Sequence, residues 1–237
     1  MRRPLVVAVA AVAAAAVTAA GGGGIWLALS DGAAPEARLG AIDRDRATGD
    51  AAGDEPAPSS PEGRWAVVAD DSVFVGYRVT ERFVGGLTDR VATGRTAAVV
   101  GGVTVAGDRI TAASFTADLT QLDSSQERRD SALRHRGIET GRYPEASFEL
   151  TVPIRLSDAP ARGETVEVTA VGGLTLHGRT APVRVALEAR WDGATISIAG
   201  EAPITLADFG IDAIDVHGLV RTDDRATLEL QLLLVPA

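Results

Sequence analysis

Aliphatic and polar residues alternate along two stretches in the second half of the chain. Residues 183–189 read VRVALEA, and residues 228–232 read LELQL. Because successive side chains of a β-strand point to opposite faces, each stretch has one aliphatic face and one polar face. Strands of this kind form a wall that is dry on one side and wet on the other. This pattern favours a barrel with an open interior.

Other strand-like stretches follow one another at regular spacing, with turn residues between them. Gly107-Asp108 predicts a hairpin, and Asp192-Gly193 predicts another turn. Many short strands of this kind are typical of a sandwich or a barrel. The expected strands are Trp65–Val68, Ser72–Val79, Thr96–Val105, Arg109–Leu119, Ala146–Val152, Thr165–Val171, Val183–Ala189, Thr195–Ala199 and Leu228–Leu234.

Small residues are frequent in two of the expected strands, and two explanations are open. They leave space in the interior that larger side chains would fill, or they let the strands twist and pack closely. The sequence pattern supports both explanations equally. The residues concerned are Ala97, Ala98, Gly101, Gly102, Ala112 and Ala113.

A charged segment interrupts the strands in the middle of the chain. We expect a short helix from Gln126 to Arg136, capped by Ser124 or Ser125 and ended by Gly137. The segment has no long apolar stripe, so we expect it to be exposed.

The arginines of this segment have two interpretations. In one, Arg129 and Arg134 contact the head group of a ligand, because guanidinium groups suit anionic or carbonyl oxygens. In the other, the helix is simply solvated and Asp130 pairs with Arg134. Charged helical faces are usually only surface, which favours the second interpretation.

Residues 4–30 contain no charged side chain, and Arg2 and Arg3 stand directly before them. A helix of this length exceeds the roughly 30 Å hydrocarbon core of a bilayer. We expect a membrane anchor within residues 1–30, with the arginines on the inner side. The alternative is a signal peptide cleaved after Thr18-Ala19-Ala20. Both place the rest of the chain outside the cytoplasm, anchored to the membrane or secreted.

Residues 31–63 are rich in Ala, Pro, Asp, Gly and Ser, with almost no large apolar side chain. Such a segment buries too little surface to offset its chain entropy, so we expect a disordered tether. Residues 64–237 are long enough for one folded domain. Nothing in their pattern indicates an oligomeric state.

Composition excludes several classes of function. The chain has no cysteine, which rules out disulfides, thiolate metal sites and cysteine nucleophiles. Its formal net charge is −9, which argues against a nucleic-acid partner because phosphate binding needs a basic face.

No catalytic or metal-binding pattern stands out. His177 precedes Gly178 between two strand-like stretches, where it most often fixes a hairpin. The three histidines lack metal-ligand spacing, and no nucleophile elbow appears. Asp208-Phe209-Gly210 matches a kinase motif in letters only, and Phe209 is better interpreted as an aromatic plug at a barrel end. We therefore expect neither an enzyme nor a bound metal ion.

Four motifs occur in the order and spacing of one family. TADLTQLDSSQERRDSAL, GRYPEASFELT, VGGLTLHGRTAPVRVAL and ITLADFGI together resemble the YceI-like family of exported, lipocalin-like proteins. The resemblance covers about residues 65–235. Many members have a histidine two residues after the Arg-Asp pair, where this chain has Ala132.

The resemblance implies an all-β fold, an eight-stranded antiparallel barrel, with a hydrophobic pore for a polyisoprenoid or similar amphiphilic lipid. No cofactor is expected beyond such a ligand, for example a prenyl quinone. The alternative is an exported stress-response or interaction module whose barrel is filled by its own side chains and which has a protein partner. The side chains expected to contact the lipid are Phe74, Phe115, Leu119, Phe148, Leu150, Leu176, Val183, Val185, Leu187, Phe209 and Leu230.

Overall fold

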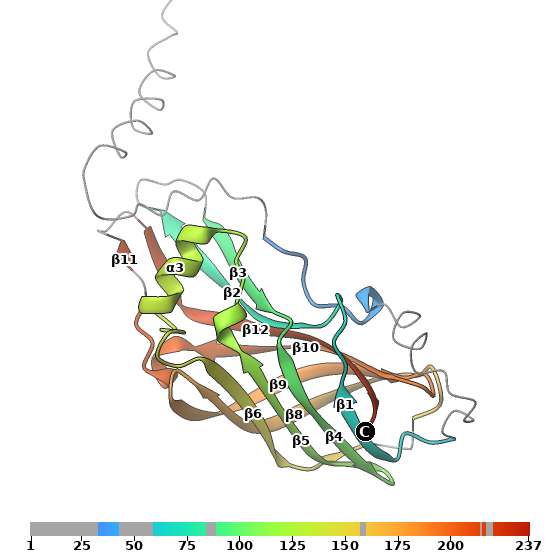
Figure 1. Ribbon diagram of the computed structural model, residues 1–237. Coiled ribbons are helices and arrows are strands. Elements are labelled where there is room, and N and C mark those ends of the chain that lie inside the picture. Colours follow the sequence, from blue (N-terminus) through green and yellow to red (C-terminus); the bar gives the residue numbers. More distant parts are fainter. Residues whose placement is uncertain (1–32, 43–58, 84–88, 157–159, 214, 217–219) are drawn as a thin grey trace, which may run out of the picture.

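The computed structural model describes residues 33–42, 59–83, 89–156, 160–213, 215–216 and 220–237. They form the expected all-β fold, an eight-stranded antiparallel barrel with one short α-helix, α3 (Glu127–His135) (Figure 1). The anchor or signal helix expected within residues 1–30 lies outside the described residues. No helix in the described part of the chain is both long enough and apolar enough to cross a membrane.

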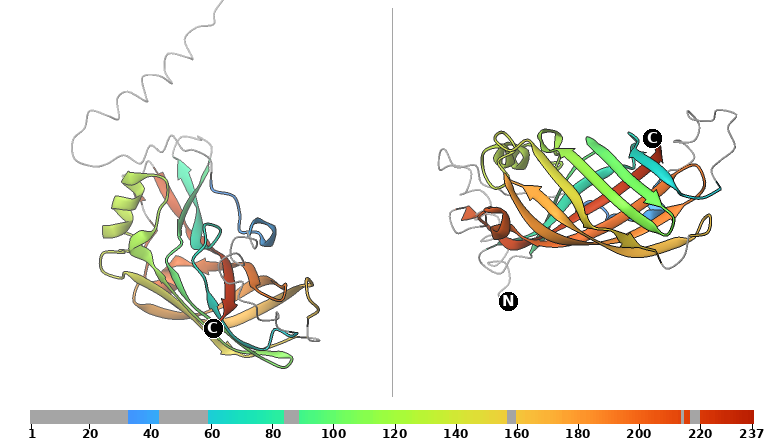
Figure 2. Two further views of the ribbon diagram at one scale, coloured as in Figure 1. Left: turned by 45° about the vertical axis from the view of Figure 1, so that its right-hand side comes forward. Right: turned by 90° about the horizontal axis from the view of Figure 1, so that it is seen from below.

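Antiparallel pairing orders the main strands as β1-β4-β5-β6-β8-β9-β10-β12-β2-β3, and β1 pairs with both β4 and β12. The eight strands from β1 to β12 in this order form the closed circuit, and β2 and β3 continue from β12. The first and last strands of the domain thereby close the ring (Figure 2). The strands are β1 (Gly63–Val67), β2 (Phe74–Phe83), β3 (Arg90–Thr96), β4 (Val99–Ala106), β5 (Arg109–Asp118), β6 (Glu145–Val152), β7 (Ile154–Arg155), β8 (Thr165–Leu176), β9 (Arg179–Trp191), β10 (Ile196–Thr205), β11 (Asp215–Val216) and β12 (Val220–Pro236). The 3-10 helices are η1 (Leu39–Ala41), η2 (Leu119–Gln121) and η3 (Leu206–Phe209).

Most expected strands are confirmed, and the exceptions have physical reasons. The pattern analysis missed β3, because its sequence, RVATGRT, is small and polar and shows no aliphatic alternation. In β6, Phe148 and Leu150 line the interior as expected, but Val152 points outward and is 53% exposed. An irregularity in the pairing with β8 lies between Leu150 and Val152, and such a bulge reverses the alternation.

Helix α3 differs from its sequence-based description. Its N-cap residue is Gln126, with no side-chain cap, so neither Ser124 nor Ser125 caps it. Gly137 adopts a positive φ of 65° just past the C-cap, as expected for a helix end. The expectation of a fully exposed segment is wrong, because Arg129 and Leu133 are buried against the barrel.

Two glycines in β4 settle part of the question about small residues. A Cβ at Gly101 would collide with the Ser114 backbone of β5, and one at Gly102 would collide with the Trp65 carbonyl of β1. At these two positions, close approach of the strands explains the small residues.

Residues 33–42, here called the docked segment, lie against the outer face of the barrel (Figure 1). Thr93 Oγ1 accepts a hydrogen bond from the Ala34 N–H at 3.3 Å, and Gln231 Oε1 accepts one from the Arg38 N–H at 3.0 Å. Element η1 lies against β9 and β10. The sequence predicted a disordered tether over this range, and for residues 33–42 that prediction is wrong.

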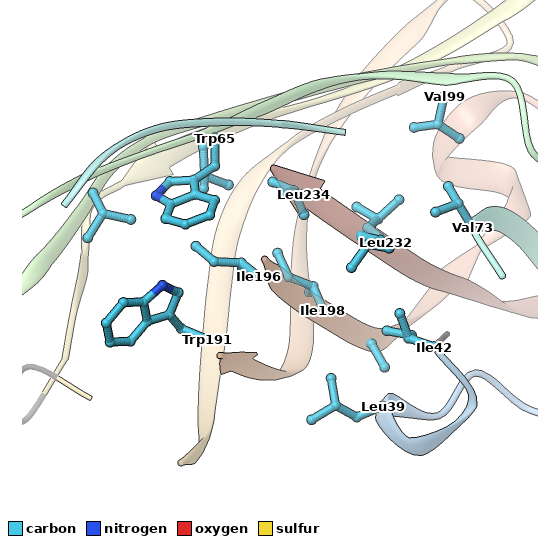
Figure 3. Packing of buried hydrophobic residues seen from close by; sticks show 14 of the residues in the cluster. Leu39, Ile42, Trp65, Val73, Val99, Trp191, Ile196, Ile198, Leu232 and Leu234 are labelled. Carbon is cyan, nitrogen blue, oxygen red and sulfur yellow. The ribbon is translucent and has the colours of Figure 1, made fainter. Parts of the chain in front are cut away.

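The docked segment is held because it covers both apolar and charged groups. Leu39 and Ile42 are each 5% exposed and belong to one buried cluster (Figure 3). The same cluster contains Leu233 of β12. Beside them Glu229 pairs with Arg78 at 2.9 Å and with Arg95 at 3.1 Å. A few large side chains in an otherwise small and polar segment are enough to fix it.

We expect Leu39→Ala to lower the free energy of unfolding by about 2 kcal/mol or more, because it removes a buried side chain from the docked segment. Urea unfolding measures the change. Arg38→Ala is the control, since the Arg38 side chain is 74% exposed and only its backbone contacts the barrel. Equal stabilities of the Leu39→Ala variant and the parent would contradict the docking.

Candidate lipid-binding cavity

A cavity of about 250 Å³ runs through the barrel interior. Its walls are formed by side chains that alternate inward from nearly every long strand, which is the arrangement that the pattern in β9 and β12 predicted. Valine, leucine, isoleucine and alanine dominate the lining, with Phe115 and Phe148 as its aromatic residues apart from Tyr77. The cavity is therefore suited to an apolar occupant.

The structure places most of the predicted lipid contacts on the cavity wall. The residues that line it are Phe115, Leu119, Phe148, Leu150, Leu176, Val183, Val185, Leu187 and Leu230. Phe74 is not among the lining residues. Cζ of the Arg95 guanidinium lies over the Phe74 ring, 3.8 Å from the ring centre. Phe209 is 1% exposed and packs in a buried cluster with Leu174 and Ile204. Phe209 itself is not among the lining residues.

One part of the interior is densely packed rather than open. Trp65, Trp191, Ile196 and Leu234 are all buried in one cluster that lies next to the junction of β1 with β12 (Figure 3). None of these four residues is among the cavity lining. The open space thus lies away from this packed end.

At the helix-covered part of the cavity, a buried ion pair joins α3 to the barrel wall. Arg129 Nη2 lies 3.4 Å from Glu81 Oε1, and both residues line the cavity. Their side chains are 7% and 2% exposed. Burial raises the pKa of the Glu81 carboxyl, and the Arg129 charge and hydrogen bond partly oppose this.

Tyr77 lies four residues before Glu81, on the same face of β2, and it also lines the cavity. Burial raises the pKa of its hydroxyl group, so the phenol is neutral at physiological pH. Its ring occupies the space that a Cβ at Gly94 would need. The glycine in β3 therefore makes room for the tyrosine.

The position of Arg129 is supported by the start of α3. Asp130 Oδ1 accepts hydrogen bonds from the Ser124 backbone N–H at 3.0 Å and from the Ser124 hydroxyl at 2.6 Å. Arg129 Nη1 donates to the Ser124 carbonyl at 3.4 Å. Arg134, the other predicted head-group residue, is exposed and is not among the lining residues.

The polar region of the cavity carries little excess positive charge. Among the described lining residues Arg129 is the one cation, and Glu81 lies beside it. Asp212 and Glu229 are also in the lining, and Glu229 is paired with arginines of the outer face. This region offers hydrogen-bonding groups within an otherwise apolar enclosure.

His177 has a structural role outside the cavity lining. It adopts a positive φ of 53° and, with Gly178, turns the chain between β8 and β9. Its ring nitrogens lie 3.2 Å from the Phe209 carbonyl and 3.0 Å from Glu139 Oε2. These contacts agree with the interpretation of His177 as a hairpin residue.

No group of three or more His, Asp and Glu side chains in the described part of the chain could hold a metal ion.

A family model described as the YceI-like domain matches residues 66–234. The chain belongs to the YceI-like family. In the described part of the chain, the match covers β2 to β11, the last two residues of β1 and all but the last two residues of β12. For this YceI-like chain, no match was found among curated proteins.

Two solved structures have a similar fold. One is a polyisoprenoid-binding domain from Saccharophagus degradans, with 18% identity and a TM-score of 0.56, covering 73% of this chain and 98% of that one. The other is BcnA of Burkholderia cenocepacia, with 20% identity and a TM-score of 0.53, covering 70% of this chain and 98% of that one. At these identities the similarity establishes the fold of the YceI-like domain alone.

Sequence reasoning missed Tyr77 and Glu81 as members of the site. A usable signal was present, because Val75, Tyr77, Val79 and Glu81 share one face of β2. A glutamate that continues an apolar face indicates a buried carboxylate that needs a partner. Arg129 was proposed as a head-group contact, but nothing in the sequence paired it with a residue 48 positions earlier.

Replacing Glu81 by glutamine removes a carboxyl group whose pKa is raised in the folded protein. The folded state binds the proton of the Glu81 carboxyl more tightly than the unfolded chain does. The protonated carboxyl therefore makes its full contribution to stability below the ordinary pKa of 4.5, and this contribution is lost as the pH rises through the raised pKa of the folded state. We therefore expect the stability of the parent, relative to Glu81→Gln, to fall with rising pH above 4.5.

Urea unfolding at a series of pH values measures this difference. Glu149→Gln, at an exposed position of β6, is the control. A parent-minus-variant difference that does not change with pH would show that Glu81 is not buried in the folded protein.

Proposed function

We propose that this chain is an exported, membrane-tethered protein that binds a polyisoprenoid or a similar amphiphilic lipid inside its barrel. The observation that carries the proposal is the cavity of about 250 Å³ with aliphatic walls inside the barrel. Membership of the YceI-like family and the likeness to a barrel described as a polyisoprenoid-binding domain support it.

The walls favour a flexible hydrocarbon over a flat or polar ligand. Burying one CH₂ group contributes about 0.8 kcal/mol, so one five-carbon isoprene unit contributes roughly 4 kcal/mol before ordering costs. Several units then give tight binding without any polar contact. Chain length, more than head group, sets the affinity in this mechanism.

The polar region beneath α3 is the place where a head group fits best. Arg129, Tyr77 and Glu81 supply the hydrogen-bonding groups there, and each lines the cavity. The tail then extends along the aliphatic wall formed by residues such as Leu187 and Leu230. In this orientation the protein sequesters the lipid from water and carries it without chemical change.

The alternative of a barrel filled by its own side chains is less well supported. It requires a solid core, whereas the described residues enclose open space between Phe115, Phe148 and Leu187. An enzyme acting on the lipid is also less well supported. His177 is engaged in a hairpin and is not among the lining residues of the cavity.

Export and membrane attachment are supported by the sequence of residues 4–30, which carries no charge and follows two arginines. This run lies outside the described residues. Attachment places the lipid-binding barrel beside a bilayer, which is both a source and an acceptor of polyprenyl lipids.

Neighbouring alanines of β5 test whether the cavity takes up lipid. Ala113 lines the cavity, whereas Ala112 is exposed on the opposite face of the same strand. Ala113→Phe fills part of the open space, so we expect it to reduce the fraction of protein that retains a prenyl quinone or polyprenyl phosphate. Native mass spectrometry after incubation with the lipid measures that fraction.

Ala112→Phe is the matched control and should retain lipid as the parent does. Circular dichroism establishes that both variants are folded. A parent protein that takes up neither lipid would contradict the proposed function, and so would equal uptake by the two variants.

A tyrosine pair tests the position of the head group. We expect Tyr77→Phe to weaken binding of a prenyl quinone by about 3- to 10-fold, because it removes one hydrogen bond of about 1 kcal/mol. Tyr143→Phe is the control, since Tyr143 packs against His177 outside the cavity lining. Equal affinities of the two variants, measured by fluorescence titration, would place the head group elsewhere.

A further inference from the structure

The docked segment begins only a few residues after the uncharged run of residues 4–30. Ala34 is fixed to the barrel through Thr93, and its carbonyl accepts a hydrogen bond from Arg78 Nη2 at 2.9 Å. The Pro35 carbonyl accepts a hydrogen bond from Arg95. Ala34 and Pro35, four and five residues after the end of the uncharged run, are therefore held on the outer face of β2 and β3.

This contact shortens the connection between the proposed membrane anchor and the barrel. A tether over residues 31–63 would extend to roughly 110 Å, because an extended chain spans about 3.5 Å per residue. From Ser30 to Ala34 the same geometry allows at most about 14 Å. Even if Trp26 marks the membrane interface, the reach to Ala34 is at most about 28 Å.

We infer that the outer face of β2 and β3 is seated on the surface of a lipid bilayer. The inference rests on the membrane attachment proposed above, and it adds an orientation that attachment alone does not provide. The opposite wall of the barrel, which includes β6, then faces away from the bilayer (Figure 1).

The orientation matters because β2 carries different residues on its two faces. Tyr77 and Glu81 point into the polar region of the cavity, and Arg78, between them, points outward and holds the docked segment. Seating this strand at the bilayer brings the polar region and α3 to the lipid surface. A lipid would then enter from the side of the barrel that is nearest its source.

The absence of cysteine makes the orientation measurable by labelling one position at a time. Val91 in β3 is 40% exposed, and Val152 in β6 is 53% exposed. The full-length chain, carrying either Val91→Cys or Val152→Cys, is labelled with a fluorophore and reconstituted into phosphatidylcholine vesicles that contain a nitroxide-labelled lipid as quencher. Because the chain between the membrane and Ala34 reaches at most about 14 to 28 Å, we expect at least about twofold stronger quenching at position 91 than at position 152.

Two further changes test whether the docked segment sets this orientation. Leu39→Asp places a charge in a buried position of the segment and should release it. Insertion of about 20 Gly and Ser residues after Ser30 adds a mean reach of about 25 Å without altering the barrel. Each change should lower quenching at position 91 to the level of position 152, whereas Arg38→Ala should not.

The outcomes separate the orientation from the attachment. Flotation of the protein with the vesicles and the mass of the intact chain are measured first. Failure to float, or the loss of residues 1–20, would contradict both the membrane attachment and the orientation. A protein that floats but is quenched equally at positions 91 and 152 overturns the orientation alone. Persistence of the difference in the Leu39→Asp variant, or after the insertion, would also overturn it.

Discussion

Closure of the barrel through backbone hydrogen bonds is the constraint on which the cavity depends. A closed ring of antiparallel strands fixes the width of the interior through the number and tilt of its strands, whatever side chains point inward. In this chain the inward side chains are mainly valine, leucine, isoleucine and alanine, and they fill one end but leave space elsewhere. The pairing of β1 with β12 keeps the wall shut although that space is open. The open cavity thus follows from a wall that stays closed without a fully packed core.

The second constraint is the placement of charge inside this apolar enclosure. Glu81 enters the cavity because it continues the inward face of β2, and Arg129 reaches it from α3. A buried carboxylate without such a partner would cost several kcal/mol. The ion pair therefore explains why a helix of mostly charged residues lies against the barrel. The same pair provides polar groups where a lipid head group would need them.

The sequence predicted the barrel wall well because alternation is local. A residue such as Leu187 is assigned to the interior by its neighbours alone, and the structure agrees. Phe74 lies one position out of phase with Val75, so its ring lies by Arg95 and outside the cavity lining. The docked segment was missed because Leu39 and Ile42 are isolated in a segment of disordered composition. The segment is fixed by residues as far as nearly 200 positions away, such as Gln231, which accepts a hydrogen bond from the Arg38 backbone N–H.

The pairing of β1 with β12 also has a consequence for how the molecule is made. Trp65 faces Pro236 across this junction, so the ring cannot shut until the final strand has been synthesised. Until then, the inner surfaces of the preceding strands have no partner across the gap, and partly formed sheets with bare apolar faces are prone to aggregate. Contacts so distant in sequence also slow folding. The nascent chain therefore keeps apolar surface exposed for longer than a protein whose sheet grows by adding neighbours.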